Sequence, residues 1–146
     1  MLIPFTESDV LGATIVPEGW YEILIEDVED KASKDNQSIN SWIKGKLLKN
    51  DDTGETTFKS KDKEGKDIDV KIAGVPTPFP WIISSKGAWA AVGLFNSVFG
   101  DTIQPGDRRD TGALKGRKVV GFIGKTIYEG TLKNAFTNQW RAPKSE

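Results

Sequence analysis

The stretch INSWIKGKLL, residues 39–48, alternates in the manner of a β-strand that has one buried face. Successive side chains of a strand point to opposite sides, so one side is predicted to carry Ile39, Ser41, Ile43, Gly45 and Leu47. The opposite side then carries Asn40, Trp42, Lys44 and Lys46. A tryptophan in line with two lysines either packs against a neighbouring element or offers a surface to stacked bases and their phosphates.

The segments on either side of this strand extend the β pattern. Residues 19–28, GWYEILIEDV, alternate in the same way and predict a first strand, and the polar residues 29–38 predict the loop that joins it to the second. The charged residues beyond position 48 contain two glycine turns, which predict short strands near 55–60 and 67–73.

The second half of the chain begins with an extended segment, PTPFP at 76–80, because prolines exclude helix there. Residues 84–100 then show helical spacing and predict one amphipathic helix, with a serine cap at its start and Gly100 at its end. Its predicted apolar face carries Trp89, Val92, Phe95 and Phe99. Residues 101–113 have no period and predict a surface loop.

The last part of the chain predicts a β-hairpin. RKVVGFIGKTIY and TLKNAFTNQW have the composition of strands, and Glu129-Gly130 between them suits a two-residue turn. If 55–60 belongs to an inserted arm, five main strands remain, with the helix between the third and the fourth. We therefore predict a mainly β fold: an OB-fold-like five-stranded barrel with one α-helix between strands 3 and 4 and a β-hairpin extension.

A chain of 146 residues suits one domain, so we predict a single OB-like domain over 1–146, and the residues discussed below make nucleic-acid binding its expected role. Flexible segments are expected near 1–15, 101–113 and 141–146. The sequence has no apolar run of the roughly 20 residues that cross a bilayer, and MLIPFTESDV lacks the basic start of a signal peptide. We expect no membrane contact and a cytoplasmic location, which is the host cytoplasm if the protein is viral.

The composition lowers the expectation of an enzyme. The chain has no cysteine and no histidine, so the commonest transition-metal ligands and the commonest general base are missing. We predict no catalytic residue, no metal and no cofactor. The net charge of −1 is unevenly divided: residues 1–85 carry −6 and residues 86–146 carry +5. This asymmetry permits a basic face on a nearly neutral molecule.

A nucleic-acid interface is predicted from aromatic and basic residues that share the proposed surface. Trp42 stacks bases, and Lys44, Lys46 and Asn40 lie along the same row. The supporting candidates are basic or aromatic residues of the neighbouring strands and loops: Lys31, Lys34, Phe58, Lys71, Arg117, Lys118, Lys125, Tyr128 and Arg141. An aromatic residue in a strand is also common in a core, and a lone surface lysine often does no more than keep the chain in solution.

Two other functions stay open. Asp69-Val70-Lys71 has the Asp-x-Lys ending of many Mg²⁺-dependent nucleases, with Asp51 or Asp52 as an upstream partner. Alternatively, the protein is a structural or protein-interaction module in which Trp42 fills an interface. Gly-Lys-Thr at 124–126 matches the end of a phosphate-binding loop, but it precedes more strand, whereas such a loop must open a helix. We therefore expect no ATP site there.

Several motifs resemble those of phage-encoded single-stranded DNA-binding proteins. PEGWYEILIEDVEDKASKDNQSI resembles their opening, and LKGRKVV followed by YEGTLKNAF, which contains Asn134, resembles their closing hairpin. LFNSVFG resembles the helix that precedes their fourth strand. The resemblance implies an OB-fold that coats single-stranded DNA in replication or recombination, without a cofactor. Self-association, replication or recombination partners, and RNA in place of DNA all stay open.

Overall fold

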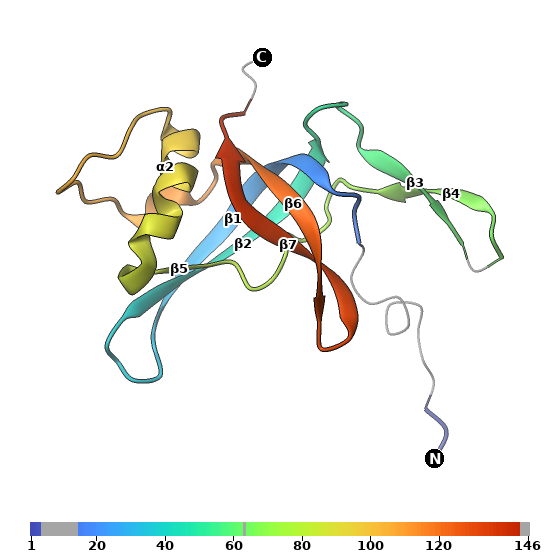
Figure 1. Cartoon of the computed structure of the whole chain (residues 1–146), viewed down its shortest axis with the longest axis horizontal. Coiled ribbons are helices and arrows are strands. Elements are labelled where there is room, and N and C mark those ends of the chain that lie inside the picture. The colour runs from blue at the N-terminus through green and yellow to red at the C-terminus, as the bar shows by residue number, and fades with distance from the viewer. Residues whose placement is uncertain (4–14, 63, 144–146) are drawn as a thin grey trace.

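The computed structural model describes residues 1–3, 15–62 and 64–143. It is mainly β, as predicted, with one five-stranded antiparallel sheet in the order β5-β2-β1-β6-β7 and a separate two-stranded hairpin, β3-β4 (Figure 1). Strands 1, 2, 6 and 7 are long: β1 is Gly19–Ala32, β2 is Ile39–Asn50, β6 is Lys118–Tyr128 and β7 is Thr131–Arg141.

Two hairpins build most of the sheet. The first joins β1 to β2 through residues 33–38, where the Ser33 amide donates to the Ser38 carbonyl (2.9 Å) and Asn36 takes a left-handed φ of 56°. Asparagine tolerates that conformation better than most residues. The second joins β6 to β7 at Glu129 and Gly130, whose φ values of 51° and 77° suit the turn that was predicted. The two hairpins diverge at the lower edge of Figure 1.

The third strand of the sheet differs from the prediction. Strand β5, Ile82–Ser84, pairs with β2, whereas the predicted third strand at 67–73 lies outside the sheet. Its residues form β4, Asp67–Lys71, which pairs with β3, Thr57–Lys61, in a hairpin that projects from one end of the molecule (Figure 1). A three-residue strand gives too little alternation to be recognised in a sequence.

The order of the five strands leaves β5 and β7 at opposite edges of the sheet. In the described part of the chain no backbone pairing joins these edges, so the closed barrel stays a prediction. Side chains do meet there. Trp81, just before β5, stacks on Trp140 of β7 with ring centroids 5.5 Å apart, and it also contacts Phe136 at 4.7 Å.

The predicted helix at 84–100 is divided. Residues Ser85–Ala91 form a 3₁₀ helix, η1, and Val92–Phe99 form the α-helix α2, with a non-helical Gly87 inside the first piece. Both predicted ends are confirmed, since the Ser84 hydroxyl accepts from the Lys86 amide at 3.3 Å and Gly100 closes the helix at a φ of 70°. The predicted face is wrong at Trp89, which is 79% exposed.

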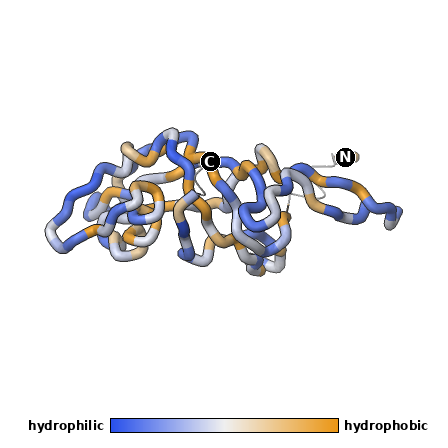
Figure 2. The backbone as a smooth tube through the Cα atoms, turned by 90° about the horizontal axis from the view of Figure 1, so that it is seen from above, coloured by the Kyte–Doolittle hydropathy of each residue, from blue (hydrophilic) through white to orange (hydrophobic). Residues whose placement is uncertain are grey.

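The core lies between the concave side of the sheet and α2. Hydrophobic and hydrophilic residues are interspersed along the tube in Figure 2, and buried and exposed positions alternate along much of β1 and β2. The core is built from β1, β2, β6 and α2 and from the segments that cover them, and Phe136 and Trp140 of β7 pack against it partly buried. Its buried side chains include Tyr21, Ile23, Ile25, Ile43, Leu47, Ile72, Trp81, Leu94, Phe95, Leu114, Val119 and Ile123.

The loop at 101–113 is tied to the sheet at its far end. It leads into a short 3₁₀ helix, η2, Thr111–Leu114, whose Thr111 hydroxyl lies 2.7 Å from the buried Ser41 hydroxyl. Ser41 also donates to the Asp30 carboxylate at 2.5 Å. This small network satisfies the one polar side chain on the buried face of β2 and fixes η2 against the β1-β2 hairpin.

Candidate nucleic-acid interface

The alternation predicted for residues 39–48 is confirmed. Ser41, Ile43, Gly45 and Leu47 are buried, and the residues between them lie on the outer face of β2. Gly45 has to be small, because a Cβ there would lie 2.8 Å from the Leu24 carbonyl oxygen. Only Ile39, at the open end of the strand, departs from the pattern and is 57% exposed. Trp42 is therefore half-buried on the outer surface and is not part of the core.

Two side chains contact the Trp42 indole. The Phe79 ring lies with its centroid 5.7 Å from that of Trp42 and is tilted by 34°, and the Lys31 ammonium lies 5.3 Å from the indole centroid. Phe79 is 77% exposed, so most of its surface is open to a ligand. We call Trp42, Phe79 and Lys31 the outer platform.

Backbone bonds on both sides hold Phe79 in place. The Thr77 amide donates to the Gly45 carbonyl (3.0 Å), and the Ile43 amide donates to the Trp81 carbonyl (2.8 Å). The proline-rich segment is thus fixed along β2 before and after Phe79. Phe79 is not an isolated exposed ring, because it contacts Trp42 and also lines a cavity, and contiguous apolar surface of this kind is more typical of interaction sites than a single exposed residue is.

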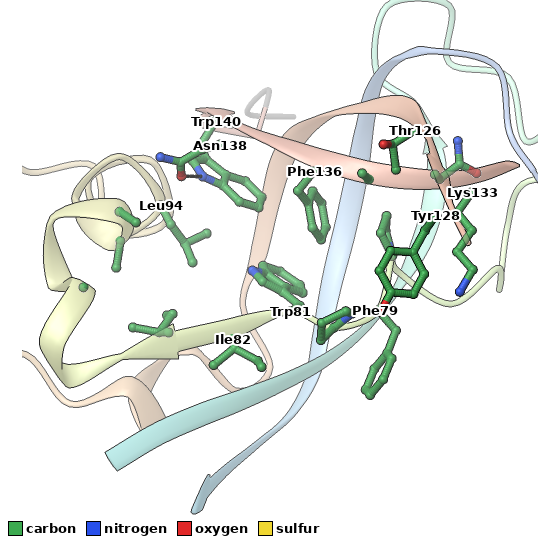
Figure 3. Close-up of a pocket in the computed structure, with 18 of the residues that line it drawn as sticks. Phe79, Trp81, Ile82, Leu94, Thr126, Tyr128, Lys133, Phe136, Asn138 and Trp140 are labelled. Carbon is green, nitrogen blue, oxygen red and sulfur yellow. Dashed lines mark hydrogen bonds between the residues drawn. The ribbon is translucent and has the colours of Figure 1, made fainter. Parts of the chain in front are cut away.

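A cavity of about 690 Å³ opens beside the platform, between the segment that leads into β5, the helix η1 and the strands β6 and β7 (Figure 3). We call it the aromatic groove. Six of its lining residues are aromatic: Phe79, Trp81, Trp89, Tyr128, Phe136 and Trp140. Figure 3 shows Trp81 on the side of β5 and Phe136 and Trp140 on β7, with Phe79 and Tyr128 at the side where the β6-β7 hairpin lies.

The rings of the groove divide into a floor and a rim. Trp81, stacked on Trp140, forms the floor and is 6% exposed. Phe79 belongs to the rim, as do Trp89 and Tyr128, which are 79% and 59% exposed. The Trp140 indole N–H donates to the Asn138 side-chain oxygen at 3.1 Å, as the dashed line in Figure 3 shows, so the floor has its polar atom satisfied.

The charges differ between groove and platform. Lys133 is the one charged side chain among the described residues that line the groove, and its ammonium lies 5.1 Å from the Tyr128 ring centroid. The platform has acidic neighbours, because Glu29 lies opposite Trp42 in the β1-β2 register and Asp27 lies opposite Lys44. Lys31 is within 3.9 Å of Glu29. An anionic ligand therefore meets cations on both hairpins and a carboxylate beside the platform.

Four further predicted residues lie on the two hairpins. Asn40 pairs with Lys31 in the register and lies beside β5, and Lys34 is exposed in the β1-β2 turn. Lys125 is exposed on β6, in register with Asn134, which lines the groove. Lys46 lies farther along β2, with its ammonium 4.0 Å from Glu26.

Other predicted residues are engaged elsewhere. Phe58 is half-buried and packs against the core, and Lys71 is exposed on the β3-β4 hairpin. The Arg117 guanidinium lies 5.1 Å from the Phe99 ring, and Lys118 lies 4.0 Å from Glu22. The structure places none of these four among the residues that line the groove.

Arg141 has a structural position. It donates to the carboxylates of Asp51 and Asp52 at 2.6 Å each, and its guanidinium lies 4.4 Å from the Trp20 ring. Desolvation lowers its pKa, but the hydrogen bonds to the two aspartates outweigh this and raise the pKa above its usual value. The arginine thus joins the end of β7 to the turn that follows β2.

The carboxylates of the nuclease hypothesis also have cationic partners. Asp69 lies 2.6 Å from the Lys59 ammonium across the β3-β4 hairpin, and Asp51 and Asp52 bind Arg141. Over the residues that the structure describes, no group of three or more acidic side chains is arranged to hold a metal ion.

Sequence reasoning missed Phe79, Trp81 and Trp89. The signal for the first two was present in PFPW, since prolines on both sides of an aromatic residue exclude helix and hold the backbone extended. Helical spacing predicts Trp89 on the apolar face of one α-helix, but the segment that holds it is a 3₁₀ helix, whose period differs.

Comparisons with known proteins give no relative: no family model matches the chain, and no curated protein is significantly similar to it in sequence. None of the helices that the structure describes is long and apolar enough to cross a membrane.

Proposed function

We propose that this protein binds single-stranded DNA with little dependence on base sequence, and protects such strands in replication or recombination of the phage type. The observation that carries the proposal is the row of aromatic rings that runs from the half-buried Trp42 to the exposed Phe79 and on to the exposed rim of the aromatic groove. Every nucleobase has a π-face, so a base stacked on an aromatic side chain gains about 1–3 kcal/mol whatever its identity.

The row of rings favours unpaired bases over duplex. In a double helix both faces of a base are already stacked and its edge is paired, so the base reaches an aromatic side chain only after unstacking. A single strand lays successive bases on Phe79 and on the rim of the groove without that cost. The groove volume of about 690 Å³ lies in the range of sites that take small molecules, so it has room for individual bases.

The position of the row on the sheet supports the same function. It lies beside β2 and β5, which are the second and third strands of the sheet when its strands are counted in chain order. It also lies between the β1-β2 and β6-β7 hairpins. In an OB-fold the ligand lies on the corresponding strands and between the corresponding loops. We propose that the sheet acts as an OB-like barrel whose open side is this groove.

Lysines supply the phosphate contacts. Lys31, Lys44, Lys125 and Lys133 are exposed on the two hairpins. Each cation that neutralises a phosphate of a single strand contributes about 0.7 to the slope of log K against log salt, so four contacts predict a slope of about −3. Glu29 and Asp27 lie beside these lysines and repel phosphates. Because the cations are few, the affinity is expected to depend only modestly on salt concentration.

The test is a fluorescence-anisotropy titration of labelled oligo-dT with the full chain at two salt concentrations, with a duplex of the same length as competitor. The proposal predicts tight binding of oligo-dT, weakening with salt at the slope above, and little competition by duplex. Absence of binding at low salt together with salt-insensitive self-association would overturn it in favour of a protein-interaction module.

The nuclease alternative has its own readout. The same labelled strand is incubated with the protein with and without Mg²⁺ and analysed by denaturing gel. The proposal predicts an intact strand in both samples. Cleavage that requires Mg²⁺ and is lost in Asp69→Asn would establish the nuclease in its place.

A further inference from the structure

Two lysines occupy ring faces at the rim of the proposed interface. The Lys31 ammonium lies 5.3 Å from the centroid of Trp42, and the Lys133 ammonium lies 5.1 Å from the centroid of Tyr128. The first pair belongs to the β1-β2 hairpin and the second to the β6-β7 hairpin, two hairpins that diverge in Figure 1.

The strand register sets both contacts. Trp42 lies opposite Glu29, and Lys31 is two residues from Glu29 on the same face of β1. Tyr128 lies opposite Thr131, and Lys133 is two residues from Thr131 on the same face of β7. Each lysine is thus the diagonal cross-strand neighbour of its ring, a distance that a long side chain spans to reach an aromatic one.

A ring face holds either an ammonium group or a base. A stacked base lies in van der Waals contact with the ring, about 3.5–4.0 Å above its plane, where it excludes the lysine from the same face. A cation–π contact at an exposed site is weaker than base stacking, so the base displaces the lysine when DNA is present. The displaced ammonium remains tethered beside the nucleotide whose base has replaced it.

Resting on the proposed function, we infer that Lys31 and Lys133 are exchange residues: each covers its ring in the free protein, leaves it when a nucleobase stacks there, and then pairs with a phosphate of the same strand. Stacking and phosphate neutralisation are therefore coupled at each hairpin. The free protein keeps Trp42 and Tyr128 partly covered by groups that a single strand converts into additional contacts.

The most direct test observes the Lys31 side chain by NMR in protein with labelled lysines. In the free protein its ε-methylene protons are expected upfield of those of Lys59, which pairs with Asp69 on the β3-β4 hairpin and serves as the matched control. Saturating oligo-dT of about 16 nucleotides should move the Lys31 signal to its position in the Trp42→Leu variant, and leave Lys59 unchanged.

The proposed pairing of each lysine with a phosphate is tested by the salt dependence of oligo-dT binding. Lys31→Met keeps the length of the side chain and removes the charge, and it should reduce the salt slope of oligo-dT binding by about 0.7. Lys31→Arg should keep the slope, and Lys59→Met should leave it at the parent value. Lys133→Met should behave as Lys31→Met does.

The outcomes separate the inference from the function beneath it. If the parent binds oligo-dT but the Lys31 signal stays at its upfield position in the saturated complex, the exchange is wrong and the binding function stands. An unchanged slope in Lys31→Met with binding intact contradicts the phosphate contact in the same way. Failure of the parent to bind any oligo-dT overturns the proposed function and the exchange together.

Discussion

Trp81 and Trp140 stack nearly parallel, with ring centroids 5.5 Å apart and ring planes 12° apart, across the line where the two edges of the sheet approach each other. Trp81 precedes β5 and Trp140 belongs to β7. In the described residues these edges share no backbone pairing, so aromatic side chains connect them. This arrangement leaves room for the groove and at the same time provides its floor.

Trp81→Ala should therefore destabilise the fold strongly. The side chain is almost fully buried against Trp140 and Phe136, and removal of a buried tryptophan typically costs about 3–5 kcal/mol. Urea unfolding followed by circular dichroism measures the free energy of unfolding. A loss below about 1 kcal/mol would show that the stacked pair does not connect the edges.

Gly121→Ala should also destabilise the protein, by about 1–3 kcal/mol. An added Cβ would lie 2.7 Å from Cζ3 and 2.9 Å from Cε3 of Trp140, and that ring is held by Trp81 and Phe136. Gly124→Ala on the same strand is the matched control, because its Cβ would meet only the Thr137 methyl at 3.4 Å. Equal unfolding midpoints for the two variants would contradict a fixed position of Trp140.

Glu29→Gln should strengthen DNA binding by about two- to fivefold at low salt. The carboxylate lies opposite Trp42 and within 3.9 Å of Lys31, so it repels an incoming phosphate and competes for the lysine. Removing one exposed charge near such a contact changes the binding energy by up to about 1 kcal/mol. Glu55→Gln, an exposed acid outside the described lining of the groove, should bind as the parent does. Weaker binding by Glu29→Gln would show that phosphates do not pass the platform.

Trp89→Ala should weaken binding of long oligo-dT by about 1–3 kcal/mol with no loss of stability. The side chain is 79% exposed at the rim of the groove and contributes little to the core. Ile68→Ala, which removes an exposed apolar side chain from β4, is the control. If Trp89→Ala binds oligo-dT as the parent does, the bound DNA does not reach η1.

The sequence predicted those parts of the structure that follow from local periodicity. The buried and exposed faces of β2, the Glu129-Gly130 turn and the helix end at Gly100 are all confirmed. Each depends on residues within a few positions of one another, and side-chain alternation or a left-handed glycine fixes each locally.

Other parts depend on contacts that local pattern does not record. Strand β5 has three residues and is defined by its pairing with β2. The exposure of Phe79 follows from the hydrogen bonds that tie its neighbours to Gly45 and Ile43. Trp89 was misassigned because Gly87 and the 3₁₀ geometry change the phase between residues 84 and 92.

The basic residues illustrate the same limit. The charge of Arg141 and its place near the last hairpin predict DNA binding, yet it pairs with two aspartates about 90 positions earlier in the chain. Lys133 was not singled out, although the register of β6 and β7 places it over Tyr128 at the groove. Whether a lysine or arginine meets a carboxylate, a ring or solvent is decided by tertiary contacts.

The central claim is that the rings of the outer platform, Trp42 on β2 and Phe79 on the segment beside it, hold nucleobases, and the Trp42→Ala and Phe79→Ala variants test it most directly. Anisotropy titration with oligo-dT should show each variant weakened by about 1–3 kcal/mol, while circular dichroism shows both folded. Ile68→Ala should match the parent. If both ring variants remain folded and bind oligo-dT as tightly as the parent, the platform is not the binding site.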